Sequence, residues 1–239
     1  NYNRPLTQFQ EDLLTVIVKQ RLVHYPLQYI IGRWSFFGHE FFVGPGVLIP
    51  RADTETVMDV CMEYLAGDKE YKVLDLCAGT GCIGISIAAE RENAQVALVE
   101  KYAEALTYLN KNVEHNGVGV EVIQGDVLEG CASDKKYDLI VSNPPYISAK
   151  EMKSLQAELS FEPETALLGG EDGLAAPAVG EPAAERGADR HADEADREHP
   201  RLLHGVEVEM RVGGDRRHHE RDKAHVHRVE RPAHARGDE

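Results

Sequence analysis

The sequence predicts an α/β fold with a doubly wound, mostly parallel sheet, and two observations lead to this prediction. From Lys72 to Ser142, short apolar runs alternate with stretches whose apolar residues recur at helical spacing. The polar motifs of the sequence fall at the ends of these runs. Strands that alternate with helices form a parallel sheet through right-handed crossovers. Ligands of such sheets bind beyond the carboxyl ends of the strands.

The individual elements follow from the same alternation. Apolar runs bounded by turn residues are typical of strands, and the longer segments between them are typical of helices. Strands are expected at Val73–Leu76, Val96–Val99, Val120–Gln124 and Asp138–Ser142, and helices at Cys82–Glu90 and Ala103–His115.

The N-terminal part of the chain differs from this region. Residues 1–30 carry apolar side chains at helical spacing. Residues 34–42 are aromatic and interrupted by Gly38, which predicts two short strands in a hairpin. A helix is expected to begin near Asp53, whose carboxylate can cap it, with Glu55 in its first turn.

The composition changes abruptly after Leu174. Residues 175–239 contain no Ser, Thr, Asn, Gln, Cys, Ile or aromatic residue, yet they hold eight of the eleven histidines. A segment so poor in large side chains cannot offset its ordering entropy, so we expect a disordered or non-native tail without site residues. A histidine-rich metal-binding tract is the alternative. Only residues 206–212 alternate with period two, which would allow pairing at a sheet edge.

Composition and charge restrict the function. The 239 residues carry a formal net charge of −15, which disfavours duplex DNA as a partner and favours a basic protein. No apolar run approaches the ~20 residues of a membrane span, and no signal-peptide pattern follows Asn1. We expect a cytoplasmic protein with reduced thiols and no metal, because the cysteines show no zinc-ligand spacing. They are Cys61, Cys77, Cys82 and Cys131.

The stretch Val73–Gly84 combines a buried strand, an acid near its end, a turn of small residues and the start of a helix. Small residues let the backbone approach a ligand, and the N–H groups of the turn can face its polar atoms. Gly79–Gly84 reads GxGxxG, and Glu100 follows about twenty residues later, so a dinucleotide site is an alternative. Asp75 precedes these glycines, where a carboxylate would repel a pyrophosphate but suits the amino and sulfonium groups of S-adenosylmethionine.

Acidic residues also follow the next two strands. Glu100 ends the second strand and can accept two ribose hydroxyls in a bidentate contact. Asp126 follows the third strand, where it can accept the amino group of adenine while Val127 packs on the ring. Taken one at a time, a solvated strand-end charge or ordinary turn chemistry would explain either acid.

The segment Asn143-Pro144-Pro145-Tyr146 follows the fourth strand and decides the chemical class. Two prolines fix the backbone and remove two N–H donors, which leaves the carbonyls of this turn free to accept. A planar NH2 group can donate to the Asn143 side-chain oxygen and to the Pro144 carbonyl, with Tyr146 over its flat face. A rigid turn without chemistry would explain this segment alone. Polar residues at four successive strand ends, however, favour one site for methyl transfer to a planar nitrogen.

Beyond these motifs, the chain resembles the glutamine N5-methyltransferase family that modifies class 1 peptide-chain release factors. The resemblance covers roughly residues 20–174. Its most specific part is a hairpin-and-linker block, since Asn-Pro-Pro-Tyr is shared with DNA adenine methyltransferases. The matching segments are Pro26–Gly32, Phe37-Gly38, Val47–Arg51, Asp53–Glu55, Glu162-Pro163, Ala166-Leu167 and Gly169–Leu174.

The resemblance implies a class I methyltransferase domain with a seven-stranded sheet. It divides the chain into a remnant of a helical N-terminal domain (1–30), a β-hairpin linker (31–52), the methyltransferase domain (53–174) and the atypical tail (175–239). Together with the strand-end chemistry, it assigns S-adenosylmethionine to Asp75, Cys77, Ala78, Gly79, Thr80, Gly81, Glu100, Asp126, Val127 and Asn143. The expected catalytic residues are Asn143, Pro144 and Tyr146, and Pro145 joins them in binding the target glutamine. Cys77 stands where many methyltransferases have glycine, which a small thiol should tolerate.

The expected reaction is direct displacement at the sulfonium methyl by an amide nitrogen of a class 1 release factor. Positioning would supply most of the rate gain, up to ~7–11 kcal/mol. An adenine-N6 DNA methyltransferase is the alternative among enzymes, but base flipping needs a basic track, and residues 1–174 hold 14 basic against 26 acidic side chains. We therefore expect no direct nucleic-acid or membrane partner. A non-catalytic remnant that still binds cofactor or partner is the alternative outside enzymes.

Overall fold

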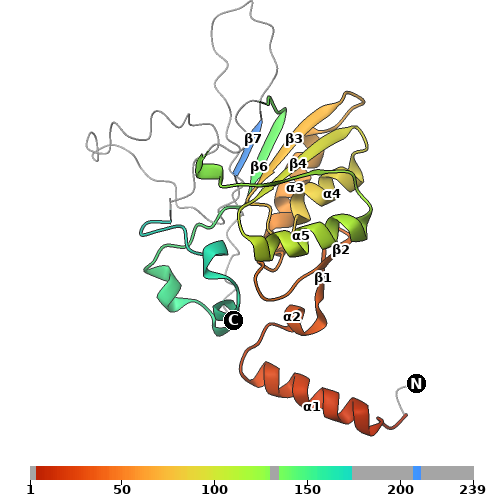
Figure 1. Cartoon of the computed structure of the whole chain (residues 1–239), viewed down its shortest axis with the longest axis vertical. Coiled ribbons are helices and arrows are strands. Elements are labelled where there is room, and N and C mark those ends of the chain that lie inside the picture. The colour runs from red at the N-terminus through yellow and green to blue at the C-terminus, as the bar shows by residue number, and fades with distance from the viewer. Residues whose placement is uncertain (1–3, 130–134, 174–206, 211–239) are drawn as a thin grey trace, which may run out of the picture.

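A computed structural model of the chain describes residues 4–129, 135–173 and 207–210, and Figure 1 shows how its elements are arranged. The α-helices are α1 (Gln8–Leu22), α2 (Leu27–Ile31), α3 (Ala52–Tyr64), α4 (Cys82–Glu90) and α5 (Ala103–Asn116). The 3-10 helices are η1 (Val127–Glu129), η2 (Glu151–Ser154), η3 (Ala157–Phe161) and η4 (Glu164–Ala166). The strands are β1 (Arg33–Phe36), β2 (His39–Phe42), β3 (Tyr71–Leu76), β4 (Ala94–Glu100), β5 (Glu121–Gln124), β6 (Leu139–Ser142) and β7 (Glu207–Met210).

The larger sheet confirms the predicted α/β fold. Its strand order is β5-β4-β3-β6-β7, and both β4 and β6 run parallel to the central strand β3. The register pairs Leu76 with both Val99 and Ser142, so three strands end at one edge of the sheet. The chain moves outward through β4 and β5 on one side of β3 and then crosses to β6 on the other. Sheets of this kind open a crevice at such a switch point.

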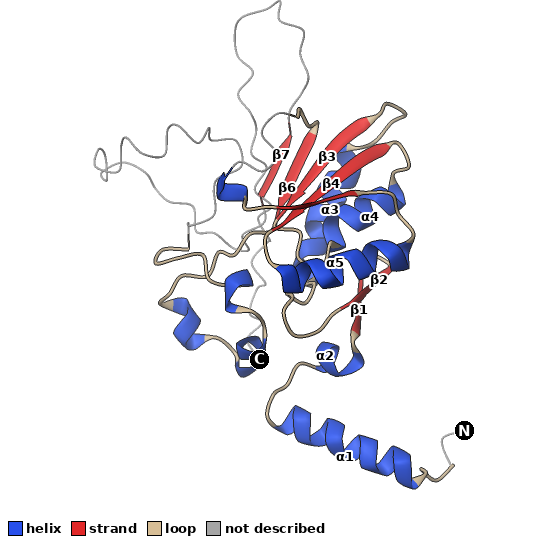
Figure 2. Cartoon of the chain, viewed as in Figure 1, coloured by secondary structure: helices blue, strands red, loops and turns tan. Residues whose placement is uncertain are grey.

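Alternate residues of the strands face two separate apolar clusters. On one face, Val73 and Leu98 pack with side chains of α3, α4 and α5, among them the fully buried Leu109. On the other face, Leu74 and Val99 belong to a smaller cluster to which none of the described α-helices contributes. Figure 2 shows α3, α4 and α5 together beside the sheet. Among the described residues, α-helices cover one face of the sheet only, so the second helical layer of a doubly wound sheet stays a prediction.

α3 starts near Asp53 as predicted, but its N-cap residue differs from the prediction. The helix begins at Ala52, and Arg51 takes the N-cap position in an extended conformation. The Thr54 N–H bonds to the Arg51 carbonyl at 3.0 Å, so Asp53 lies inside the first helical turn and cannot be the N-cap. Asp53 lies in the first turn together with Glu55, which was predicted there, and the helix dipole favours acidic side chains at this end.

β7 is the described part of the C-terminal segment. It pairs antiparallel with β6, with Val208 opposite Val141, at the edge of the sheet. Here the structure differs from the disorder expected over residues 175–239, because the alternating stretch within 206–212 supplies backbone partners for β6. The histidine-rich part of that segment lies outside the described residues.

The helix α1 extends away from the rest of the chain in Figure 1. A capping box formed by Thr7 and Gln10 begins it, yet none of its residues is buried, and Phe9 and Leu22 are 75% and 74% exposed. Packing of an apolar face supplies most helix stability in proteins, so α1 is stabilised here mainly by its local contacts. Within the described ranges, no helix is both long and apolar enough to cross a membrane.

A buried amide fixes the β1–β2 hairpin beside α5. Asn112 is fully buried, and its oxygen accepts a hydrogen bond from the Phe42 N–H at 2.6 Å. Its amino group donates to the carbonyls of Phe42 (3.2 Å) and Thr80 (2.9 Å), so both kinds of polar group are satisfied. Asn112 therefore ties the hairpin to the turn after β3, and this turn borders the site.

Candidate active site

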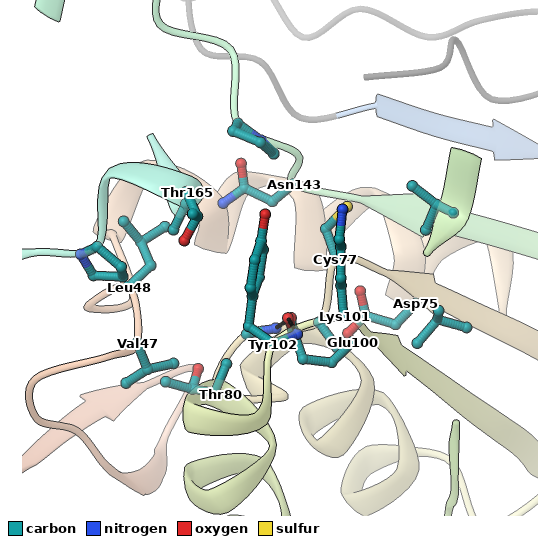
Figure 3. Close-up of a pocket in the computed structure, with 18 of the residues that line it drawn as sticks. Val47, Leu48, Asp75, Cys77, Thr80, Glu100, Lys101, Tyr102, Asn143 and Thr165 are labelled. Carbon is teal, nitrogen blue, oxygen red and sulfur yellow. Dashed lines mark hydrogen bonds between the residues drawn. The ribbon is translucent and has the colours of Figure 1, made fainter. Parts of the chain in front are cut away.

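A cavity of about 440 Å³ opens at the carboxyl edge of the sheet (Figure 3). This volume lies within the ~300–1,000 Å³ of typical small-molecule sites. The turn after β3, the ends of the neighbouring strands and the linker between β2 and α3 form its walls. The predicted site residues that line it are Asp75, Cys77, Ala78, Gly79, Thr80, Glu100, Asp126, Val127, Asn143 and Pro145.

The turn after β3 presents its backbone to this cavity. Cys77 and Gly79 both have a φ of 58°, in the left-handed region that favours glycine. Nothing lies within 4 Å of the point where a Cβ of Gly79 would stand, so a ligand can approach the backbone there. The Ala78 N–H bonds to the Val99 carbonyl at 3.0 Å and thereby holds the turn against β4.

Asp75 lies buried near the end of β3, with 1% of its surface exposed. Its Oδ2 accepts a hydrogen bond from the Gly84 N–H of α4 at 2.9 Å. A Cβ on Gly84 would stand 2.1 Å from Leu98 Cδ2, so only glycine allows α4 to approach so closely. Burial raises the pKa of Asp75 to about 7, against the effect of the Gly84 hydrogen bond and with a further rise from Glu100. A cation beside Asp75 would favour its ionised form.

Glu100 is held by two backbone donors at the end of β4. Its Oε2 accepts from the Gly79 N–H and its Oε1 from the Tyr102 N–H, both at 2.8 Å. Each carboxylate oxygen keeps a further lone pair, so both can still accept a hydroxyl of a ligand. The bidentate contact with two ribose hydroxyls is compatible with this geometry and stays a prediction.

Asp126 also has two partners. The Lys101 ammonium donates to Oδ2 at 2.8 Å, and the Leu128 N–H donates to Oδ1 at 2.9 Å. These hydrogen bonds, that of Lys101 first, lower the pKa of Asp126, so the carboxylate is ionised at neutral pH. Lys101 and Tyr102 line the cavity as well, and sequence reasoning missed both. Their place directly after Glu100 was the available signal.

Asn143 lies where this cavity meets a second one of about 700 Å³. None of the hydrogen bonds among the described residues engages its side-chain amide, which points into the first cavity in Figure 3. Its oxygen and its amino group are therefore available to a bound molecule. The residues that line both cavities, and so form their common wall, are Leu48, Thr54, Asn143 and Ala166.

The rest of the Asn-Pro-Pro-Tyr segment divides between the two cavities. Pro145 lines the first cavity, whereas Pro144 and Tyr146 line the second. Burial raises the pKa of Tyr146, although the charge of Arg51 acts in the opposite direction, so the phenol is neutral at physiological pH. A neutral aromatic ring beside the common wall is what the predicted cover for a flat amide requires.

Gly81 is a predicted cofactor residue that lines neither cavity. It is the N-cap of α4, with a φ of 78°, and a Cβ there would stand 2.7 Å from Ile85 Cδ1 and 3.4 Å from Leu109 Cγ. Its backbone conformation and the packing of α4 against α5 explain the glycine. The contact of Gly81 with a cofactor stays a prediction.

The thiols beside the cavity are unsuited to nucleophilic chemistry. Burial raises the pKa of both Cys77 and Cys82 to about 12, so they are protonated at neutral pH. In the part of the chain that the structure describes, no cluster of His, Cys, Asp and Glu side chains could hold a metal ion.

Other lining residues come from segments that local periodicity did not connect with the site. The hairpin-and-linker block and the Glu162-Pro163 motif marked these segments by resemblance only. From the linker and α3, the cavity receives Gly46, Val47, Leu48, Pro50 and Thr54, and from the segment after η3, Pro163, Glu164, Thr165, Ala166, Leu168 and Gly169.

Several known proteins are similar to this chain. Release factor glutamine methyltransferases of Geobacter sulfurreducens and Bordetella pertussis are 38% and 37% identical to the chain over 175 and 172 residues. These matches cover 73% and 72% of this chain and 61% and 64% of the two relatives. The Bacillus subtilis protein of the same name is 43% identical over 155 residues, which are 62% of this chain and 54% of that protein. The chain thus spans less than two thirds of the length of these curated relatives.

A family model described as the methyltransferase small domain matches residues 50–168. Among solved structures, the T. thermophilus 16S rRNA N2 G1207 methyltransferase in complex with AdoMet and guanosine is 27% identical, with a TM-score of 0.43. That match covers 49% of this chain and 33% of the other. The family model runs through the turn after β3 and the Asn-Pro-Pro-Tyr segment, and shows a methyltransferase small domain in this chain. Over this region and the segments beside it, the chain is similar to the release factor glutamine methyltransferases.

Proposed function

We propose that the chain transfers a methyl group from S-adenosylmethionine to the side-chain amide nitrogen of a glutamine in class 1 release factors. One observation carries this proposal: the Asn143 amide, without a hydrogen-bond partner among the described residues, lies on the wall between two cavities. A methyl donor in the first cavity and a planar amide in the second would meet at this wall. The names of the relatives support the choice of substrate.

The first cavity suits S-adenosylmethionine by the chemistry of its polar groups. Glu100 is set to accept ribose hydroxyls, and Asp126 to accept the amino group of adenine beside Val127. Asp75 supplies a buried carboxylate for the amino and sulfonium charges, and Gly79 leaves the backbone open to close approach. When bound, the cofactor supplies an electrophilic methyl group.

The second cavity would bind and orient the amide. The Asn143 side-chain oxygen and the Pro144 carbonyl can accept its two hydrogens, and Pro144 has no N–H that could compete. Tyr146 would cover the flat face of the amide. An amide nitrogen is neutral and a poor nucleophile, so orientation would supply the rate gain, up to ~7–11 kcal/mol.

The release factor as partner belongs to the same proposal, as does a cytoplasmic location, where release factors act. The acidic balance of residues 1–174, with 14 basic against 26 acidic side chains, supports a protein partner over duplex DNA. The division of the chain into residues 1–30, 31–52, 53–174 and 175–239 is likewise proposed.

Two measurements test this function. Titration calorimetry with S-adenosylmethionine is expected to give one site per chain. Incubation with the cofactor and a class 1 release factor is expected to add one methyl group to a glutamine, located by peptide mass spectrometry. A release factor with that glutamine replaced by alanine is the control. Cofactor binding without methylation of the release factor would contradict the proposed substrate, and methylated adenine in duplex DNA would point to the alternative enzyme.

A further inference from the structure

Two segments that carry the family resemblance, Ile49-Pro50-Arg51 and Glu162-Pro163, take no part in the chemistry proposed above. The structure brings them into contact. Glu162 forms an ion pair with the guanidinium of Arg51, which lies 111 residues earlier in the chain. Its Oε2 also accepts a hydrogen bond from the Ile49 N–H at 2.9 Å. We call these contacts of Glu162 with Ile49 and Arg51 the Glu162 clamp.

The Glu162 clamp is buried on the carboxylate side. The Glu162 side chain is only 2% exposed, and a carboxylate at such depth is tolerated when both its charge and its lone pairs are matched. One oxygen faces a guanidinium and the other a backbone N–H. Removing Glu162 would leave the Ile49 N–H without this partner and Arg51 without its counter-charge.

A second ion pair, which is more exposed, shows why the burial of the Glu162 clamp matters. Arg21 and Glu158 form a salt bridge at 2.5 Å, but their side chains are 37% and 42% exposed. Exposed pairs of this kind contribute little to stability, because water screens both charges. The Glu162 clamp combines an ion pair with a buried backbone hydrogen bond and therefore holds its segments more firmly.

The Glu162 clamp joins two segments that border both cavities, the linker at residues 47–51 and the segment at residues 162–167. We call these segments the two lips of the site. On the linker side, Leu48 lines both cavities and Arg51 lines the second. On the opposite side, Glu162 lines the second cavity and Ala166 lines both. Leu48 and Ala166 belong with Asn143 to the common wall, so the separation of the two lips affects the geometry of this wall.

Packing around the Glu162 clamp makes the lips one unit with the segment before β1. The Tyr29 hydroxyl donates a hydrogen bond to the Val47 carbonyl at 2.6 Å, and this bond ties the linker to α2. The rings of Tyr25 and Phe161 meet edge to face, with their centroids 5.2 Å apart, and hold the end of η3. These contacts restrict the motion of both lips, and Glu162 supplies the buried charge between them.

We propose that Glu162 is a positioning residue for methyl transfer. It keeps the linker and the segment from η3 to η4 at the separation at which Asn143 can present a substrate amide to the first cavity. This inference rests on the proposed function, because it assigns a role within the same site.

Two variants and a control test the Glu162 clamp. Glu162→Gln keeps an oxygen for the Ile49 N–H but removes the charge that Arg51 requires. Arg51→Met combined with Glu162→Gln removes both charges, so no unpaired charge is left. Glu151→Gln is the matched control, because it removes one exposed carboxylate from the neighbouring helix η2.

The measurements are the cofactor Kd, kcat and KM for release factor methylation, the thermal midpoint and amide exchange over residues 47–51 and 162–167. Glu162→Gln is expected to lower kcat at least ~tenfold, with the cofactor Kd within ~threefold of the parent and faster exchange in both segments. The double variant is expected to regain the parental midpoint but not the parental kcat. Glu151→Gln is expected to match the parent throughout.

Parental kcat and KM in Glu162→Gln would overturn the proposal. Recovery of the parental kcat in the double variant would also overturn it, since the contacts would then be dispensable. A parallel loss of midpoint, cofactor affinity and kcat would indicate a purely structural residue and count against positioning. If the parent binds cofactor but does not methylate release factor, the proposed function fails. Amide exchange then tests by itself whether the Glu162 clamp holds the two lips together. Faster exchange of both lips in the double variant then supports the Glu162 clamp, and unchanged exchange refutes it.

Discussion

The two cavities that share a wall are built in different ways. The first is formed mainly by strand ends and the segments that follow them. Backbone N–H groups fix two of its acids, Asp75 through Gly84 of α4 and Glu100 through Gly79 of the turn after β3. The second is formed largely by segments outside the sheet, which Glu162 joins across 111 residues of chain. The sheet itself therefore organises the first cavity, whereas the second cavity depends on long-range contacts between segments outside the sheet.

The largest expected effect comes from breaking the wall between the cavities. Asn143→Ala should lower kcat by ~100-fold or more, because the group that orients the amide is lost. The cofactor Kd should change only a few-fold, since one hydrogen bond to a neutral partner contributes ~0.5–1.5 kcal/mol. Single-turnover methyl transfer and calorimetry measure the two quantities separately. Near-parental turnover would refute the joint use of the cavities, and loss of cofactor binding would assign Asn143 to the first cavity alone.

The close packing of α4 against the sheet offers a second test of the first cavity. Gly84→Ala would place a Cβ 2.1 Å from Leu98 Cδ2 and push the α4 backbone away from Asp75. Overpacking of this kind should lower the free energy of unfolding by ~1–3 kcal/mol and weaken cofactor binding. Urea denaturation and calorimetry measure both. Gly119→Ala is the matched control, since nothing lies within 4 Å of its Cβ position, and equal stability of the two variants would contradict the packing argument.

The difference between the two cavities also decides which features could be predicted from the sequence. Strand-end acids such as Asp75 and Glu100 could be located, because parallel strands bring their carboxyl ends together whatever the loops do. The cap of α3 could not, since Asp53 has a suitable side chain but the helix already begins after Arg51. The partner of Glu162 could not either, because local periodicity says nothing about contacts between segments so far apart.

A moderate effect is expected from pH on the first cavity. The pKa of Asp75 is about 7 in the folded chain and 3.8 as its ordinary value, so the folded state binds more protons between these pH values. Stability should therefore fall as pH rises from about 4 to about 7 and then level off. A bound cation favours the carboxylate, so the cofactor affinity should rise several-fold over the upper part of this range.

Unfolding free energies and cofactor Kd values from about pH 5 to about pH 8 measure both trends. Asp75→Asn should lose this contribution to the pH dependence of stability. An unchanged slope in the variant would assign the trend to another group.

The smallest effect is expected in the turn after β3. Cys77 adopts a φ of 58°, a conformation that costs an L-residue ~1–2 kcal/mol, whereas glycine adopts it freely. Glycine loses more backbone freedom on folding, by roughly 0.5–1 kcal/mol, so Cys77→Gly should stabilise the chain by at most about 1.5 kcal/mol. Chemical denaturation measures the change. A loss of stability would mean that the hydrogen bond between the Cys77 thiol and Ser142 outweighs the backbone strain.

The long separation between Glu162 and Arg51 also affects the order of events in folding. β3, α4 and β4 follow one another along the chain, so their contacts close short loops. Contacts between distant residues tend to form late, after the nucleus of a fold has assembled. Interactions that are absent from the transition state change the unfolding rate more than the folding rate. The Glu162 clamp is therefore expected to set how long the native state lasts before it opens, while the sheet sets how quickly the chain folds.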